Sequence, residues 1–169
     1  MSAEIEKLLP HRAPMRWLDA LVECTDTTAT GTVLVTPEHF AVVSGTMLES
    51  ALVECAAQTV AAALGQRRRA SGDSGPAQTG MLAAVSNFQI TARPAVGDTL
   101  TIEVREVKRL GPMLMIAARI VVGQPPSAGT VLQAPPLAEH QAGALGGLTT
   151  GEGASPTKLI ATGELTLYA

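Results

Sequence analysis

One run of the sequence limits the possible folds more than any other, the stretch from Met47 to Leu64. It is made of strong helix formers without Gly or Pro, and Gly65 follows at a position where helices commonly end. Nearly every face of such a helix would be apolar, and a helix that is apolar all round is usually buried on all sides. We therefore expect a protein in which a β-sheet wraps around one long central helix.

Segments with strand-like patterns lie on both sides of this helix. Two predicted strands, 17–24 and 27–36, form a hairpin before it, and a short helix at 3–9 precedes them. The other predicted strands follow the helix, at 81–92, 99–108, 113–122 and 159–168. This order predicts an α+β fold in which one antiparallel sheet packs on one helix.

Two segments are predicted to lie outside the regular elements. Residues 66–79 are polar and rich in Gly and Ser, so we interpret their arginine run, Arg67 to Arg69, as a solvated loop after the helix. Residues 124–158 are rich in Pro, Gly and Ala and show no sustained period. We interpret them as a long flexible insertion within a single domain that spans residues 1–169.

The composition argues against several classes of function. The 169 residues are 46% hydrophobic but only 2% aromatic, and the net charge is −3, so neither a stacking platform for bases nor a basic face for nucleic acid is expected. No run approaches the roughly 18 apolar residues of a membrane span, so we expect a soluble cytoplasmic protein without a membrane partner. Cys24 and Cys55 lack the paired spacing of a metal site, and we expect neither metal nor cofactor.

Three polar residues interrupt the apolar helix. Ser50, Glu54 and Gln58 are spaced by four, so they lie on one stripe of the helix. A carboxylate in apolar surroundings is costly unless it is paired, and a Glu held in this way can act as a general acid or base. The same pattern fits a stripe that faces water or a partner subunit, or a Glu54 that bonds backbone groups. Periodicity alone leaves these alternatives open.

The start of the helix offers a second candidate feature. Unpaired N–H groups near Glu49, Ser50 and Ala51 could bind and polarise a thioester carbonyl, which would make the neighbouring α-carbon more acidic. The Glu49 side chain lies on a different stripe, where its simplest role is to complement the positive end of the helix dipole. With Gln58, these three residues are the candidate substrate-binding residues.

Three segments occur in the order and spacing of the hotdog-fold (3R)-hydroxyacyl-acyl-carrier-protein dehydratases. They are LLPHRAPMRWLDALVE (8–23), LVECAAQ (52–58) and NFQITARPAVGDTL (87–100), and the final ATGELTLYA also fits. The chain resembles this family over nearly its whole length apart from residues 124–158. The resemblance implies an antiparallel sheet around the long helix, a homodimer with active sites at the subunit interface, and an acyl carrier protein that brings the substrate.

In the fatty-acid enzymes of this family, a His of one subunit and the helix Glu of the other eliminate water, while an amide at the helix start binds the thioester oxygen. Glu54 matches the helix Glu. The family's motif H-F-P-G-x-P-x-x-P-G-V is replaced here by HFAVVSGTMLESALVE, in which His39 lies one residue further from the Glu. His39 is therefore either a slipped equivalent of the catalytic His or a loop residue.

A divergent branch, the dehydratases of aryl-polyene pigment clusters, resembles the chain more closely. The shared features are P-H-x-x-x-M at residues 10–15, G-x-L-A at residues 80–83 and the helix pattern E-x-x-A-Q. In that branch His11 is the first candidate to work with Glu54, and His39 is the second. The resemblance predicts dehydration of a 3-hydroxyacyl thioester to the trans-2-enoyl thioester. The alternatives are a hotdog thioesterase and a non-catalytic subunit.

Overall fold

The computed structural model describes residues 2–73, 80–123 and 157–168. Six strands form one antiparallel sheet in the order β1-β2-β6-β7-β8-β5, and β3 pairs with β4 in a separate hairpin. Within these ranges no helix is both long enough and apolar enough to cross a membrane. The elements are α1 (Ser2–Ile5), β1 (Ala20–Cys24), β2 (Thr28–Leu34), β3 (Val42–Val43), β4 (Thr46–Met47), α2 (Glu49–Ala70), β5 (Met81–Ile90), β6 (Thr99–Leu110), β7 (Met113–Val122) and β8 (Lys158–Tyr168).

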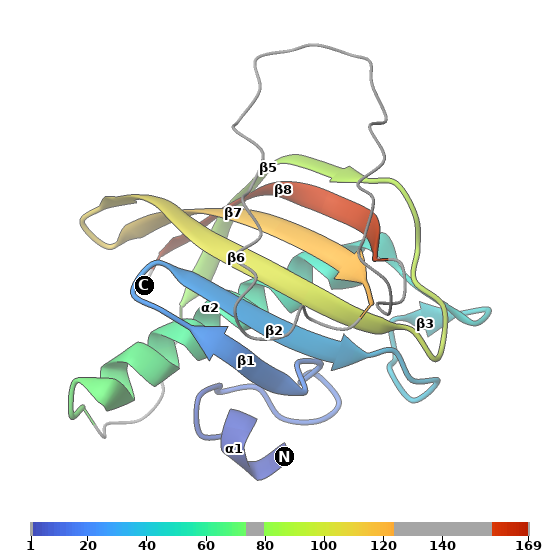
Figure 1. Cartoon of the computed structure of the whole chain (residues 1–169), viewed down its shortest axis with the longest axis horizontal. Helices are drawn as coiled ribbons and strands as arrows, with labels where there is room; N and C mark the ends of the chain where they lie inside the picture. The colour runs from blue at the N-terminus through green and yellow to red at the C-terminus, as the bar shows by residue number, and fades with distance from the viewer. Residues whose placement is uncertain (1, 74–79, 124–156, 169) are drawn as a thin grey trace, which may run out of the picture.

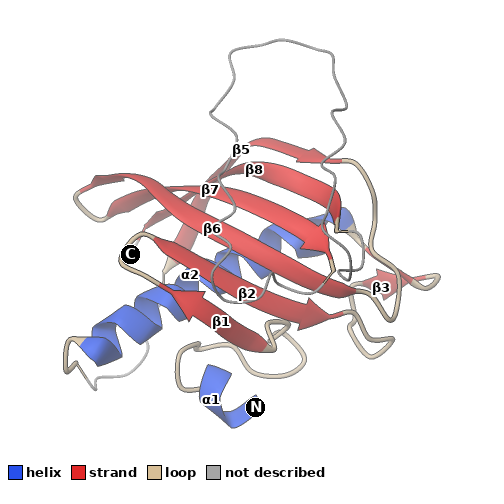
Figure 2. Ribbon diagram, viewed as in Figure 1, coloured by secondary structure: helices blue, strands red, loops and turns tan. Residues whose placement is uncertain are grey.

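Helix α2 lies across one face of the large sheet, as Figures 1 and 2 show, and packs against β1, β2 and β6. Alternate residues of the strands point toward it, as the two-residue period of a strand requires. The buried residues of β6 and β7 on this face are Leu100, Ile102, Val104, Leu114, Ile116, Ala118 and Ile120. This is the α+β hotdog fold that the sequence predicts, and the prediction is confirmed.

A glycine in β2 brings the helix close to the sheet. A Cβ on Gly31 would lie 2.7 Å from Leu18 Cδ1 and 2.8 Å from Thr59 Oγ1, which is closer than real Cβ atoms approach such neighbours. Gly31 pairs with the buried Ile102 of β6. The missing side chain therefore sets the distance at which α2 packs on the strands.

The end of α2 differs from the prediction. The helix continues through Gly65 to Ala70, and Gly65 lies where the Leu8 carbonyl oxygen occupies the position that a Cβ would need. The interpretation of Arg67 to Arg69 as a loop is therefore wrong, since these residues form the last helical turn, where positive charge is favourable. The Arg67 Nε donates to Thr25 O at 2.7 Å and ties the helix end to the β1–β2 turn.

Smaller differences concern the N-terminal half and the predicted insertion. The first helix ends at Ile5, and β1 begins at Ala20 rather than at residue 17. Between β2 and α2, where no strand is predicted, the chain forms β3 and β4, and Ser44 and Gly45 have positive φ in the turn that joins them. The predicted insertion lies outside the described residues up to position 156, and Lys158 begins β8.

Strand β5 forms one edge of the sheet and is exposed over most of its length. Its register places Leu82 opposite the buried Leu167 and Val85 opposite the buried Leu165, so both side chains lie on the face that carries α2. They are nevertheless 38% and 44% exposed, because the helix packs mainly on the other half of the sheet. This strand also contains no charged residue.

Candidate active site

The helix carboxylate meets one of the two predicted histidines. His11 Nε2 lies 3.6 Å from Glu54 Oε1, slightly beyond hydrogen-bond distance. Their side chains are 33% and 31% exposed, so a substrate can reach both. The His11 Nδ1 atom is buried without a hydrogen-bond partner among the described residues, which leaves Nε2 as the nitrogen that faces the carboxylate. Both groups come from one chain, whereas the resemblance implied a His and a Glu from different subunits.

Gln58 lies one helical turn after Glu54 and is completely buried. Its Nε2 donates to Glu54 Oε1 at 2.8 Å and to Met15 O at 2.7 Å. Its Oε1 accepts the N–H groups of Trp17 at 3.0 Å and Leu18 at 3.2 Å. These four bonds use both amide protons and both lone pairs of the side chain. Gln58 thus forms a buried network that joins α2 to residues 15–18, and its contact with substrate stays a prediction.

Backbone and arginine contacts hold the segment that carries His11 in a compact turn. The Arg12 Nη1 donates to the carbonyl oxygens of Leu9 at 2.8 Å and His11 at 2.9 Å. The N–H groups of Met15 and Arg16 both donate to Arg12 O. His11 therefore sits in a segment that is fixed on one side by these bonds and on the other by Gln58.

His39 occupies a different environment. Its ring centroid lies 6.5 Å from that of Trp17, and the neighbouring Phe40 ring lies 5.3 Å from Trp17. Within the described residues, no hydrogen bond or ion pair joins His39 to Glu54. The geometry thus brings His11 to the helix carboxylate and places His39 beside a buried aromatic side chain.

The start of α2 carries an ion pair that the sequence did not reveal. The Arg93 side chain lies 2.6 Å from Glu49 Oε1, and its hydrogen bond lowers the pKa of the Glu49 carboxyl. Arg93 belongs to the NFQITARPAVGDTL segment, but it is 44 positions from its partner, so no local pattern marks the pair. The Ala51 N–H donates to Leu48 O at 3.1 Å, whereas Ser50 is exposed.

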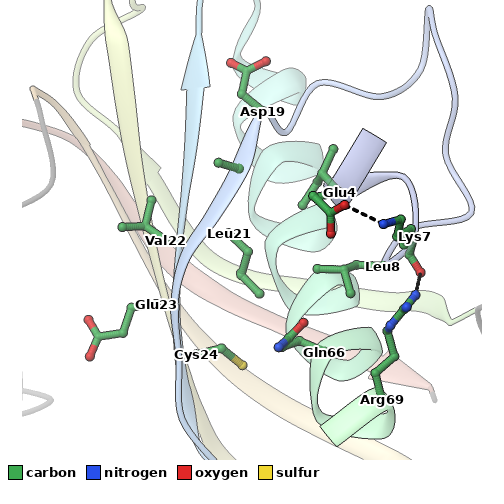
Figure 3. Close-up of a pocket in the computed structure, with 12 residues that line it drawn as sticks. Glu4, Lys7, Leu8, Asp19, Leu21, Val22, Glu23, Cys24, Gln66 and Arg69 are labelled. Atoms are coloured by element: carbon green, nitrogen blue, oxygen red, sulfur yellow. Dashed lines mark hydrogen bonds and ion pairs between the residues drawn. The ribbon is translucent and has the colours of Figure 1, made fainter. Parts of the chain in front are cut away.

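A separate cavity of about 410 Å³ lies between α1, β1 and the C-terminal half of α2 (Figure 3). In this view Leu21 and Cys24 project from β1 toward the helix, whereas Val22 and Glu23 lie on the other side of the strand. None of the predicted site residues lines it. The Lys7–Glu4 ion pair and the bond from Leu34 N–H to Asp19 Oδ2 engage three of its charged groups. The candidate active site is therefore the His11–Glu54 pair and not this cavity.

Comparisons with known proteins agree with the fold. The ApeP-like family, described as ApeP dehydratase, matches residues 3–136. The dehydratase heterocomplex ApeI:P from Xenorhabdus doucetiae superposes with a TM-score of 0.71 at 17% identity, covering 97% of this chain and 89% of that chain. The PaaI protein of the E. coli phenylacetic acid degradation operon superposes with a TM-score of 0.54 at 14% identity, covering 88% of this chain and 81% of that chain.

A hypothetical thioesterase with coenzyme A from Streptococcus pneumoniae gives a TM-score of 0.53 at 11% identity, covering 88% of this chain and 83% of that chain. At these identities the structural likeness shows the fold alone. A comparison with curated protein sequences finds no match. The family match extends over most of the sequence and includes both His11 and Glu54. On this evidence, the chain belongs to the ApeP-like dehydratase family.

Proposed function

We propose that the chain dehydrates a 3-hydroxyacyl thioester, carried by an acyl carrier protein, to the trans-2-enoyl thioester. The observation that carries the proposal is the 3.6 Å separation of His11 Nε2 and Glu54 Oε1 on a partly exposed surface of α2. Elimination of water needs one group to take the α-proton and another to protonate the departing hydroxyl. A His and a Glu side by side supply both. Membership of a dehydratase family supports the same assignment.

In the proposed reaction His11 removes the α-proton while the bond between the β-carbon and its hydroxyl oxygen breaks. Glu54 gives its proton to that oxygen, which leaves as water, and the α and β carbons become doubly bonded. Proton exchange with each other or with solvent returns both side chains to their starting states. Backbone N–H groups of Glu49 and Ser50, about 7 Å along the helix axis from Glu54, would bind the thioester oxygen as negative charge develops on it.

Replacing the acid tests the assignment. Glu54→Gln should lower kcat for enoyl formation by at least about 100-fold, because an amide cannot supply the proton, while Gln58 can still donate to the new amide oxygen. The measurement follows a carrier-bound 3-hydroxyacyl substrate by mass spectrometry, with circular dichroism as the check on folding. Glu23→Gln, on the exposed side of β1, is the matched control and should leave turnover unchanged. Undiminished turnover in Glu54→Gln contradicts the proposal.

A thioesterase is the second candidate, because the fold is shared with a protein described as a hypothetical thioesterase. The same His and Glu could activate a water molecule for attack on the thioester carbonyl. The two reactions leave different products. Release of free thiol without loss of the hydroxyl group would favour hydrolysis, and enoyl thioester without free thiol favours dehydration.

We also propose that a second hotdog subunit covers strand β5. An uncharged edge strand with exposed apolar side chains is a surface that proteins normally protect by charge or by pairing. A second copy of this chain is the occupant we propose, since an uncharged strand presents no repulsion to its own copy. A non-identical subunit is the alternative, because the related ApeI:P structure is a heterocomplex. The mass of the assembly in solution separates the two.

A further inference from the structure

We propose that Gln58 is the positioning residue that holds the side chains of Glu54 and His11 next to each other. The inference rests on the proposed dehydration, because it concerns how that acid–base pair is built. Gln58 touches no substrate. It acts through Glu54 and through the backbone of the segment that carries His11.

The first part of the argument is the way in which Gln58 connects two separate pieces of chain. Glu54 belongs to α2, while His11 belongs to a separate segment without helix or strand structure, whose turn is held by bonds within the segment. Gln58 forms hydrogen bonds with three backbone groups of this segment, the Met15 carbonyl and the N–H groups of Trp17 and Leu18. The same amide nitrogen donates to Glu54. One buried side chain therefore fixes both partners of the pair.

The second part of the argument is burial. Gln58 has no exposed surface, so none of its partners can be exchanged for water without opening the structure. Buried polar groups that lose a partner are costly, which makes the four-bond arrangement a single rigid geometry. A displacement of about 1 Å at a catalytic group can reduce a rate by roughly 100-fold. A rigid network of this kind would therefore prevent displacements of the acid and the base that lower the rate.

The third part of the argument concerns the two oxygens of Glu54. Oε1 accepts a hydrogen bond from the Gln58 amide and is also the oxygen that faces His11. An oxygen that already accepts this bond is a poor place for the acidic proton. The proton for the departing hydroxyl is thus held on Oε2, and the Gln58 amide stabilises the carboxylate that forms when the proton leaves.

Gln58→Glu is the informative substitution, because it retains an oxygen that can accept from Trp17 and Leu18 but replaces the donor to Glu54. When the introduced carboxyl is protonated it can still donate, and when it is ionised it repels Glu54. We therefore expect the ratio of variant kcat to wild-type kcat to fall with rising pH, to about one-hundredth at pH 8.5, with KM changed less than about threefold. Taking the ratio at each pH removes effects that are common to both proteins.

Thr59→Val is the matched control. Thr59 is equally buried and neighbours Gln58 on α2, and within the described residues its hydroxyl bonds only the Cys55 carbonyl of its own helix. It should leave kcat within about twofold of wild type at every pH. A Gln58→Glu protein that is folded by circular dichroism and keeps a pH-independent kcat ratio near one overturns the positioning role. Failure of the wild-type protein to form enoyl product would instead overturn the proposed function, so the two failures are distinguishable.

Discussion

At the scale of single residues, the main question is which histidine serves Glu54. His11 Nε2 is 3.6 Å from the carboxylate, whereas the ring of His39 packs near Trp17. The helix spacing alone marks Glu54 as unusual, but its partner follows only from the resemblance and is brought near it only in the folded chain. A residue far away in sequence cannot be paired with a helix position by periodicity.

We expect His11→Gln to lower kcat for dehydration by at least about 100-fold, because it removes the proposed base. His39→Gln should change kcat by less than about threefold, since its ring packs near Trp17 and, among the residues that the structure describes, no hydrogen bond or ion pair joins it to Glu54. Steady-state kinetics with one carrier-bound substrate checks both variants. The reverse order of effects would move the base to His39 and would require that loop to rearrange.

Gln58 shows a second limit of sequence analysis at this scale. Its spacing from Glu54 correctly places it on the same stripe, but its backbone partners lie 40 to 43 positions earlier in the chain. A polar residue in a helix looks the same in sequence whether it binds a substrate or anchors another segment. Only the burial and the donors and acceptors around it distinguish the two roles.

At the scale of elements, the sheet was easier to predict than the helix end. The strand at 113–122 has the same bounds in the structure, because alternation of buried and exposed side chains is a local property of the sequence. Gly65 resembled a helix terminator, yet it lies inside α2, where the close approach of the Leu8 backbone leaves no space for a side chain. Tertiary packing replaced the local rule, and the three arginines became the last helical turn.

This packing makes Gly65→Ala a prediction with an unusual sign. Alanine in a helix is normally more favourable than glycine by roughly 1 kcal/mol. Here the added methyl group overlaps the Leu8 carbonyl oxygen, and overpacking of this kind costs about 1–3 kcal/mol. We expect a net decrease of about 1 kcal/mol in the free energy of unfolding, measured by urea denaturation at fixed protein concentration.

Gln66→Ala is the control for that measurement, because Gln66 is the next residue of the helix and its side chain is exposed. Its substitution should change the free energy of unfolding by no more than about 0.5 kcal/mol. An increase in the free energy of unfolding of Gly65→Ala would show that the backbone around Leu8 can move away from α2.

At the scale of the whole molecule, the half of the sheet that α2 leaves uncovered, which ends in β5, bears on how chains assemble. Val85→Lys places a charge on the inner face of β5, where the side chain is 44% exposed and pairs with the buried Leu165. If this face meets another subunit, the charge would be buried without a partner, and the assembly should dissociate. Sedimentation equilibrium should show a shift toward single chains.

Val22→Lys is the matched variant on the opposite edge of the sheet, since Val22 in β1 is 53% exposed. It should leave the mass of the assembly unchanged. Equal dissociation by both substitutions would indicate that the lysines weaken the fold in general, and dissociation by Val22→Lys alone would move the contact to β1.

The placement of the pair within one chain also predicts the behaviour of mixed assemblies. When a chain carrying His11→Ala is combined with one carrying Glu54→Gln, no single chain retains both groups. We therefore expect no enoyl formation above that of the single variants, measured on co-purified mixed assemblies that carry two different affinity tags. Recovery of one active site per mixed dimer, about half of the wild-type activity, would show that the His and the Glu act across the subunit interface.

The exposed edge of β5 also affects how readily the protein aggregates in a cell. A strand of ten residues without a charge is a template for indiscriminate pairing until its intended neighbour arrives. Under the proposed pairing of two copies, the neighbour is the chain itself, and binding to the folded form draws the equilibrium away from unfolded and aggregating species. The concentration of the chain thus decides how much of it escapes aggregation.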